Sequence, residues 1–338
     1  MKEIIKHLLL SAAAVAIVAG LSLPAIAHYG VPAPVDKPAV RAPGRSLIMR
    51  GDTSEKSVKA DGSVRLTLCV TQGTLKVNGW NRKEVRVYIR DGNKFNFNVR
   101  EKNETTGDPN WITIMGVGNK GRYLGGSDCI WGNDIEIDVP LNAIISIKGQ
   151  ETTAQIDSVK RVEISTVGGD ISLRNIAAGI SAVTRQGDVT VESSKGPIRL
   201  DTTTGNIVVF EATPGEIGDP FLAKTHGGTI SLQSVQHRQV EVGSISGSVL
   251  YNGTILNGGS YNFNSNRGSM RMLIPADSSF QLQATFGAGN FNSELNIKME
   301  TENIQAGPIK TIVGRLGTGG DAFVKVSTNN GSISIRKQ

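Results

Sequence analysis

The sequence predicts an all-β protein built as a β-solenoid of short two-strand coils. From about residue 56 onward, short runs rich in Val, Ile and Thr alternate with Gly, Asn and Asp, and the chain holds 40 glycines. No window of about 11 residues or more keeps a helical spacing of apolar residues. A glycine-containing motif also recurs at a double period. These three observations together favour the solenoid.

The N-terminal 27 residues have the pattern of a signal peptide. Lys2 and Lys6 precede the apolar run LLLSAAAVAIVAGLSL, and Ala25 to Ala27 form a small-x-small cleavage sequence. The apolar run is shorter than the roughly 20 residues of a membrane-spanning helix. We therefore expect export to the periplasm or the cell surface, a mature chain that starts at His28, and no transmembrane anchor after cleavage.

Residues 28–55 are expected to be a proline-rich linker, since HYGVPAPVDKPAVRAPG holds four of the twelve prolines. Residues 56–338 then form one β-repeat domain. Within it, we expect residues 56–150 to form an irregular N-terminal β cap that covers the first coil, with strands at 73–80 and 134–140. Residues 84–100 read as a hairpin with an Asp91-Gly92 turn.

Residues 151–338 carry the repeat: a glycine, a small polar residue and an apolar-x-apolar triplet. The first six copies are 18, 18, 23, 19 and 21 residues apart, and a weaker series of strands interleaves at half that interval. Two strands with their turns make one coil of about 18–21 residues, as in a solenoid. A hairpin meander has no reason to repeat the same turn at every second strand. The copies begin at Gly169, Gly187, Gly205, Gly228, Gly247, Gly268 and Gly331.

Alternation along each strand assigns the inward and outward side chains. We expect Ile171, Val189 and Ile207 to stack in successive coils, with Ser172 and Thr190 outside. The 211–223 segment is expected to be a loop that accounts for the 23-residue interval, and residues 324–338 to close the far end. The remaining expected core positions are Leu173, Val191, Val209, Ile230, Leu232, Val162, Ile164, Ile180, Ile198, Leu200, Val240 and Val242.

Cys69 and Cys129 are the two cysteines of the chain. In an exported protein an even pair is expected to form a disulfide. The alternative, that they bind a metal, would need nearby His or Cys residues, and neither LTLCVTQ nor GSDCIWG supplies one.

The charge of the chain excludes some partners. Loss of Lys2, Lys6 and Glu3 with the signal peptide lowers the formal charge from +6 to +5. This small surplus is spread along the chain without a Lys/Arg cluster, which argues against nucleic acid. It favours anionic cell-envelope polymers or surface proteins as partners.

Motifs for catalysis and cofactors are weak. GVGNKG at 116–121 matches a dinucleotide-binding pattern, but no helix follows it, so we read it as a turn. After processing, the histidines are His28, His226 and His237. A copper site at a mature N-terminal His28 is an open alternative, although a flexible tether is a poor place for a rigid metal site. We expect no catalytic residue, no cofactor and no metal ligand.

Two acidic sets and four aromatic residues have alternative interpretations. Ca²⁺ binding is the alternative for Asp134, Glu136 and Asp138 on one strand, and for Asp170 above Asp188. A solvated acidic face is preferred, because the repeat lacks the calcium-binding nonapeptide. The aromatic residues read as core or cap packing rather than as a sugar platform. They are Trp80, Trp111, Trp131 and Tyr88.

Several ordered segments over residues 60–338 resemble a known family. GTLKVNGWNRKEVRV, IEIDVPLNAIISIKG, the VGGDISL and RQGDVTV repeats, MLIPADSSFQLQATFGAG and GRLGTGGDAFVKVSTNNGSISI look like the bacterial adhesin-like β-strand-repeat domains of unknown function. The resemblance implies an extracytoplasmic β-solenoid with no established active site, and adhesion or envelope-stress roles. The 211–223 segment and the cysteine pair depart from the family pattern.

The sequence therefore favours a secreted, non-catalytic, adhesin-like or envelope-associated protein with an unidentified ligand. The alternative is an envelope enzyme that acts on polysaccharide, either as a lyase or hydrolase or through copper at His28. Polysaccharide-cleaving β-helices use clustered carboxylates or basic residues in a groove, whereas the repeats here point mostly Ser, Thr and isolated charges outward.

Overall fold

The computed structural model describes residues 52–101, 110–117, 128–303 and 309–338, and this part of the chain forms strands and no helix. The predicted signal peptide, most of the predicted linker and His28 lie outside the described residues. In the described ranges, no helix has the length and apolar character needed to cross a membrane.

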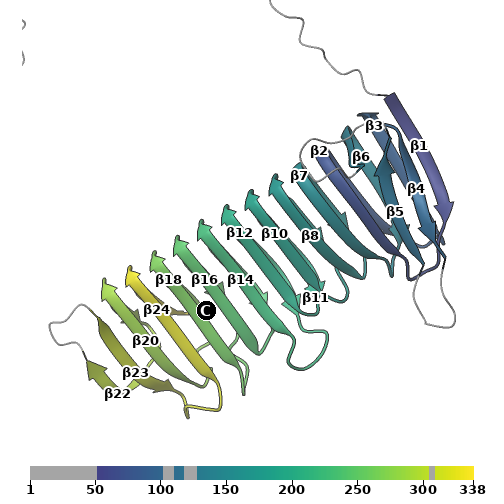
Figure 1. The fold of residues 1–338 in the computed structure, drawn as a ribbon. Coiled ribbons are helices and arrows are strands. Elements are labelled where there is room, and N and C mark those ends of the chain that lie inside the picture. Colours follow the sequence, from purple (N-terminus) through teal and green to yellow (C-terminus); the bar gives the residue numbers. More distant parts are fainter. Residues whose placement is uncertain (1–51, 102–109, 118–127, 304–308) are drawn as a thin grey trace, which may run out of the picture. The chain divides into compact units, whose positions relative to one another are not determined.

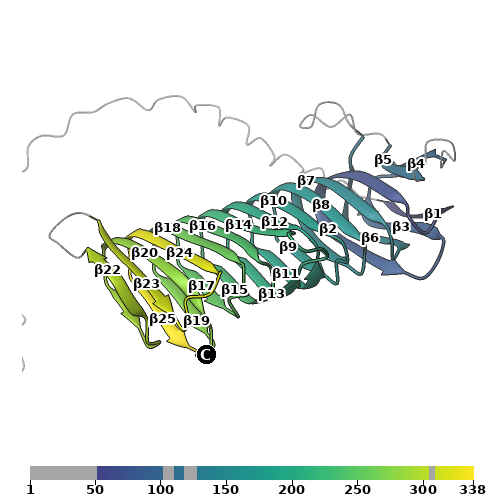
Figure 2. The same cartoon turned by 90° about the horizontal axis from the view of Figure 1, so that it is seen from below.

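Coils stack on one another, and their strands form two parallel sheets, as Figures 1 and 2 show. Strands β2 and β7 are long enough to run through both sheets. In spatial order, the first sheet contains β2 (Arg65–Trp80), β7 (Ile144–Asp157), β8 (Arg161–Gly168), β10 (Ile180–Gln186), β12 (Ile198–Thr204), β14 (Pro220–Gly227), β16 (Gln239–Ser246), β18 (Ser260–Arg267), β24 (Phe323–Asn330) and β20 (Phe280–Ala288).

The second sheet lies across the core from the first. After the second halves of β2 and β7 come β9 (Ile171–Arg174), β11 (Val189–Lys195), β13 (Ile207–Thr213), β15 (Ile230–Val235), β17 (Val249–Asn252), β19 (Met270–Ile274), β25 (Ile333–Lys337) and β21 (Phe291–Ser293). The predicted fold class, an all-β solenoid, is confirmed.

Stacked apolar side chains fill the space between the sheets. Val189 lies directly between Ile171 and Ile207 in the register of the second sheet, and all three are buried. Ile180 pairs in the same way with Val162 and Ile198 in the first sheet. The predicted inward faces are therefore confirmed, and they form one continuous core along the axis.

The turn glycines stack where two coils approach most closely. Gly187 has a φ of +142°, and a Cβ there would lie 2.3 Å from the carbonyl oxygen of Gly169 in the previous coil. A Cβ on Gly205 would lie 2.0 Å from the oxygen of Gly187. Only glycine fits these positions, which explains why the motif repeats it.

Buried hydroxyl groups satisfy the carbonyls of these turns. The Thr202 hydroxyl donates to the oxygen of Gly187 at 3.1 Å, and the Thr225 hydroxyl donates to that of Gly205 at 3.0 Å. Ser244, Ser265 and Thr328 repeat the contact in later coils. A buried carbonyl without a partner costs about 1–3 kcal/mol. The inner row therefore removes this penalty at the five turns where the contact is made.

The N-terminal cap consists of β1 (Asp52–Lys59), β3 (Glu84–Gly92), β4 (Phe95–Arg100), β5 (Trp111–Gly116) and β6 (Ile130–Pro140). The predicted 84–100 hairpin is wrong: β3 pairs with β1 and β6, whereas β4 pairs with β5. The two halves of the expected hairpin extend different sheets, and Asp91, with a φ of 50°, turns the chain between them.

Strand β2 already belongs to the parallel stack, because it lies between β7 and the β5 and β6 strands of the cap. The boundary predicted at residue 150 falls inside β7. The predicted 211–223 loop is also too long, since β13 runs to Thr213 and β14 starts at Pro220.

The C-terminal segment does not close the far end. Strands β24 and β25 insert between β18–β19 and β20–β21, so the last residues of the chain lie inside the stack. The end is covered by β23 (Lys310–Leu316), antiparallel to β20, and by β22 (Lys298–Asn303). The motif at Gly331 continues the period in space, although 63 residues separate it from Gly268 along the chain.

Candidate functional site

The outward face of the first sheet carries a surplus of positive charge. We call this surface, from β2 to β24, the basic face. Ion pairs join Lys224 to Glu241 at 2.7 Å and Arg199 to Asp201 at 3.7 Å. Among the described residues, no ion pair involves its other cations. Its cations are Arg65, Lys148, Arg161, Arg185, Arg199, Lys224 and Lys325, and its carboxylates are Glu163, Asp201 and Glu241.

A shallow groove runs across the strands of this face. Gly179, Pro197 and Pro220 lie side by side where β10, β12 and β14 begin, and none of them projects a long side chain. The result is a hollow of about 410 Å³ with Arg161, Glu163 and Arg199 along it. An adjoining hollow of about 350 Å³ shares Pro220 and Leu222 and extends to Ser260 and Asn262.

Exposed aromatic side chains lie in line with the groove on both sides. Trp111 of β5 is 40% exposed, and its indole N–H donates to the Thr67 hydroxyl at 3.0 Å. The guanidinium carbon of Arg65 lies 6.0 Å from the centre of its ring. Phe323, at the start of β24, is 41% exposed.

These residues belong to one line, which we call the entry row. It comprises the first outward position of each strand of the basic face, with Trp111 beside Arg65. In spatial order the entry row is Trp111, Arg65, Ile144, Arg161, Gly179, Pro197, Pro220, Gln239, Ser260 and Phe323.

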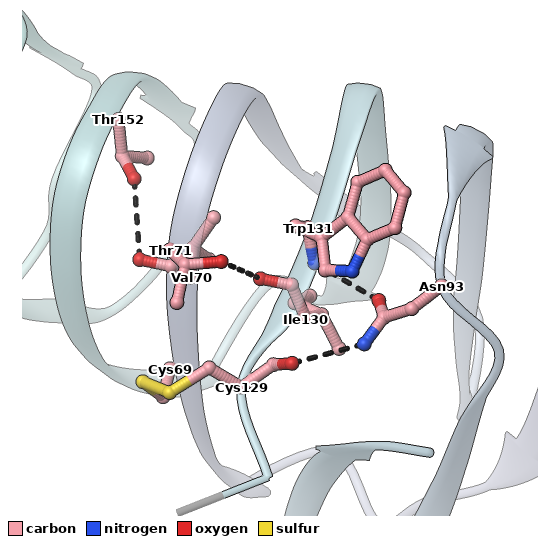
Figure 3. The surroundings of a disulfide bond; sticks show 8 residues. All are labelled: Cys69, Val70, Thr71, Asn93, Cys129, Ile130, Trp131 and Thr152. Atoms are coloured by element: carbon pink, nitrogen blue, oxygen red, sulfur yellow. Dashed lines mark hydrogen bonds between the residues drawn. A yellow bond between two sulfur atoms is a disulfide. The ribbon is translucent and has the colours of Figure 1, made fainter. Parts of the chain in front are cut away.

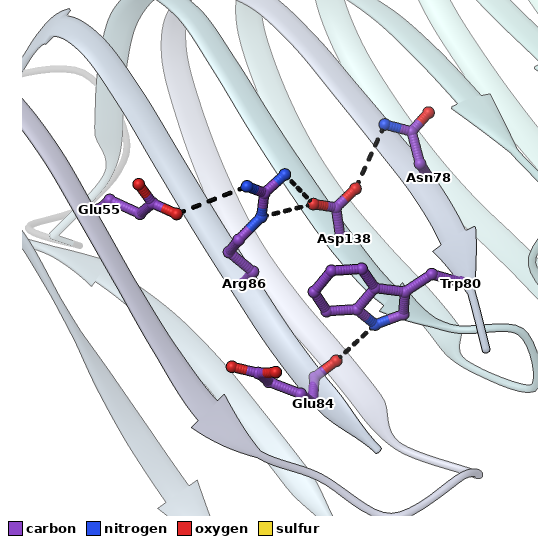
Figure 4. Close-up of polar contacts among 6 residues, drawn as sticks. All are labelled: Glu55, Asn78, Trp80, Glu84, Arg86 and Asp138. Atoms are coloured by element: carbon purple, nitrogen blue, oxygen red, sulfur yellow. Dashed lines mark hydrogen bonds and ion pairs between the residues drawn. The ribbon is translucent and has the colours of Figure 1, made fainter. Parts of the chain in front are cut away.

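The outward face of the second sheet, together with β3 and β6 of the cap, differs because carboxylates pair with most of its arginines; we call this surface the paired face. Among the described residues, Arg271 is an arginine of this face that no ion pair involves. Figure 4 shows Arg86 between Asp138 and Glu55. The Arg86 Nε donates to Asp138 at 2.7 Å, and this contact raises the pKa of the guanidinium. Arg90 pairs likewise with Asp134. The predicted strand with Asp134, Glu136 and Asp138 therefore faces arginines of β3.

A second hollow lies on the paired face, between β2 and β11. It is lined by Lys76, Asn78, Gln155, Ser172 and Glu192, together with an Asp157–Arg174 ion pair. Burial opposes ionisation of Asp157, but hydrogen bonds from Ser158, Asn175 and Arg174 outweigh it and lower the pKa of the carboxyl. The fixed partners of Asp157 make it a structural ion pair.

The stacked Asp170 and Asp188 hold the coils together. A carboxylate oxygen of Asp170 accepts the backbone N–H of Asp188 at 2.8 Å, and Asp188 accepts that of Asn206 at 2.7 Å. Asn206 in turn accepts the N–H of Thr229 at 2.9 Å. The polar residues that follow successive motif glycines thus form a ladder of hydrogen bonds along the axis. In the described part of the chain, no group of three or more His, Cys, Asp or Glu has a metal-binding arrangement.

Cys69 of β2 and Cys129, next to β6, form a disulfide in the structure, with 4.6 Å between their Cα atoms (Figure 3). Asn93 reinforces this region from the end of β3. Its side-chain amide donates to the Cys129 carbonyl at 3.0 Å and accepts from the Trp131 N–H at 2.9 Å. The disulfide therefore ties the cap to the first coil.

The aromatic residues split into packing and exposed groups. Trp80 donates its indole N–H to the Glu84 carbonyl at 2.8 Å and packs against Arg82 and Arg86. Trp131 is half-buried beside Asn93. These two fit the predicted cap packing, whereas the exposed ring of Trp111 does not.

The histidines and the dinucleotide-like motif are spread apart. His237 is fully buried, with its Nε2 2.9 Å from the Gly196 carbonyl, whereas His226 is exposed on the basic face. In the predicted 116–121 motif, Gly116 ends β5 against the Cys129 carbonyl, and residues 118–121 lie outside the described ranges.

Two features were not predicted from the sequence, although each has a recognisable pattern there. The inner hydroxyl row follows from a Thr or Ser three positions before each motif glycine, as in Thr202 and Gly205. The groove follows from Gly179, Pro197 and Pro220 at equivalent strand starts. The pairing of Trp111 with Arg65 and that of Phe323 with Ser260 join strands that are distant in the sequence, and no local pattern indicates either pairing.

Comparison with known proteins gives one family match. A family model described as Toastrack DUF4097 matches residues 53–336. No curated protein matches the chain. A solved structure of a "putative cell adhesion protein" from Clostridium sporogenes is similar over 85% of this chain and 99% of its own, at 11% identity and a TM-score of 0.27.

Proposed function

Since the chain belongs to the Toastrack DUF4097 family, we propose that it is an exported, non-catalytic, adhesin-like binding protein of the cell envelope. The basic face is its binding surface, and anionic envelope polymers or surface proteins are its partners. The observation that carries this proposal is the difference in charge between the two sheet faces.

The two faces differ in how many of their cations form ion pairs, as well as in their numbers of cations and carboxylates. On the paired face, carboxylates hold the arginines of β3 and β9 in ion pairs. On the basic face, ion pairs involve only Arg199 and Lys224 among the described residues. The cations outside these pairs are free to meet a polyanion, and such contacts weaken as salt screens them.

The groove also supports binding over catalysis. It is open and shallow, and Glu163 stands beside Ser181 and Arg199 at equivalent positions of successive strands. Polysaccharide cleavage by acid and base requires two carboxylic groups that flank one bond. The other carboxylates of this face, Asp201 and Glu241, are each held by a cation.

The test is to incubate the purified chain without its signal peptide with isolated envelopes and with soluble polysaccharides. We expect sedimentation with envelopes, no turnover of polysaccharide, and release as NaCl rises. Multiple-turnover cleavage that a single basic-face substitution abolishes would establish the enzyme alternative instead. Absence of binding to any envelope preparation would also refute the proposal.

A further inference from the structure

We propose that the ligand of the basic face is a linear anionic polysaccharide, which lies along the solenoid axis in the entry row from Trp111 to Phe323. This inference rests on the proposed function and deepens it, because it names the class of ligand and its orientation.

The direction of the ligand follows from the register. Arg65, Ile144 and Arg161 are neighbours across strands, and the row continues without interruption to Phe323. Neighbouring strands lie about 4.8 Å apart, so the line from Arg65 to Phe323 is about 38 Å long. A straight row of this length suits an extended chain better than a compact ligand.

The apolar floor suits the flat face of a sugar ring. Gly179, Pro197 and Pro220 form a smooth strip, and Leu222 widens it. A sugar ring presents C–H groups on its faces and hydroxyl groups on its edge. The edge would meet the polar side chains beside the strip, such as Ser181, Gln239 and Asn262.

The exposed aromatic rings supply stacking at both ends. Trp111 is fixed by the hydrogen bond to Thr67 and by Arg65, so little freedom is lost when a ring stacks on it. Phe323 stands at the other end of the row with a similar exposure.

The placement of charge favours an acidic polysaccharide over a denser polyanion. Arg161 of β8 and Arg199 of β12 are two strands apart, which separates them by about 9.6 Å along the solenoid axis. Cations at this axial spacing match one acidic group per pair of sugars, or every second acidic group of a chain that carries one on each sugar. A nucleic acid carries a phosphate at shorter intervals and attracts clustered cations, which this face does not have.

The experiment measures the affinity of the purified chain, without its signal peptide, for size-fractionated polygalacturonate, alginate and hyaluronan. Methyl-esterified polygalacturonate removes the charge from the same backbone. Polyglutamate and phosphatidylglycerol vesicles keep charge without sugar. We expect affinity for at least one acidic polysaccharide to rise with chain length, to level off once the row is spanned, and to exceed that for the three controls.

Substitutions locate the site. We expect Trp111→Ala and Phe323→Ala each to lower affinity by about threefold to tenfold, the range that aromatic stacking supplies. Phe210→Ala is the matched control, since Phe210 is 40% exposed but lies on the paired face. Arg271→Gln on the same face controls for the loss of one positive charge away from the row. Melting curves verify that each variant is folded.

Three results would overturn the inference: equal binding of polyglutamate, affinity independent of polysaccharide length, or equal losses in the Phe210 and Phe323 variants. Salt-sensitive binding to envelopes without binding to any of the polysaccharides would refute this ligand and leave the proposed function standing. Loss of envelope binding altogether would refute both.

Discussion

His237 is a buried titratable side chain in the core of the solenoid. Its Nε2 donates to the Gly196 carbonyl, its Nδ1 has no partner, and its ring lies 5.6 Å from that of Phe221. Burial lowers the pKa of the imidazole below its ordinary value of 6.5, because a charged ring cannot be solvated there. The ring therefore stays neutral at neutral pH.

This burial makes stability depend on pH. As the pH falls below 6.5, the unfolded chain takes up a proton at His237 before the folded chain does, so the free energy of unfolding falls until the folded pKa is passed. We expect urea titrations to give a lower free energy at pH 5.5 than at pH 7.5. His237→Gln should flatten this dependence, whereas His226→Gln should preserve it; equal slopes in all three proteins would contradict the assignment.

Val189 tests the core register. Val189→Asp places a charge without a partner between Ile171 and Ile207, at a cost of several kcal/mol. Thr190→Asp places the same charge on the outer face and should change stability by about 0.5 kcal/mol or less. Circular dichroism melts measure both. A Val189→Asp melt indistinguishable from that of the wild type would contradict the register.

The disulfide is expected to stabilise the junction between the cap and the first coil. It closes a loop with a sequence separation of 60 residues, for which the chain-entropy estimate is about 4 kcal/mol. We expect Cys69→Ser with Cys129→Ser to lower the melting temperature, and thiol titration of the oxidised, denatured protein to find no free thiol. Two free thiols would refute the pairing in the purified protein.

At the scale of the strand, the glycine motif predicts the repeating part of the fold well. Each copy carries its own turn, its inward apolar pair and its stacking position, so local sequence specifies one coil completely. Gly187 illustrates this, because its φ of +142° excludes other residues and because a Cβ there would lie 2.3 Å from the Gly169 carbonyl oxygen. The same period predicts the alignment of neighbouring coils.

The ends of the stack could not be predicted in this way. Strand β24 resembles any other coil in sequence, and its position between β18 and β20 depends on contacts more than 30 residues away along the chain. The failed 84–100 hairpin has the same cause: its strands alternate correctly, but their partners come from β1, β5 and β6. The exposed aromatic ends of the entry row depend on such pairings between distant strands.

Hydrogen exchange tests the insertion of the C-terminal strands. If β24 and β25 lie inside the stack, the amides of Val324, Val326 and Ile333 should exchange as slowly as those of Val189 in a central coil, because neighbouring coils cover both edges. The matched comparison is with β22, an edge strand of the C-terminal cap. Rapid exchange of β24, like that of a fraying terminus, would contradict the insertion.

At the scale of the described unit, the solenoid places most of its unpaired positive charge on one of its two sheets. Every second side chain of a strand points outward, and all of these lie on the same face of the sheet. Each coil therefore adds to the same surface without rearranging the core. The positive surplus that the sequence shows as a mild total is therefore concentrated on the basic face. On the paired face, carboxylates balance most of the arginines.

The most direct test of this account is the salt dependence of envelope binding in two matched variants. One replaces Arg161, Arg199 and Lys325 on the basic face with Gln, and the other replaces Arg86, Arg90 and Arg174 on the paired face with Gln. We expect the first to bind more weakly and with a shallower dependence on NaCl concentration, and the second to bind at least as tightly as the wild type. Equal loss in the two variants, or loss only in the second, would contradict the basic face as the binding surface.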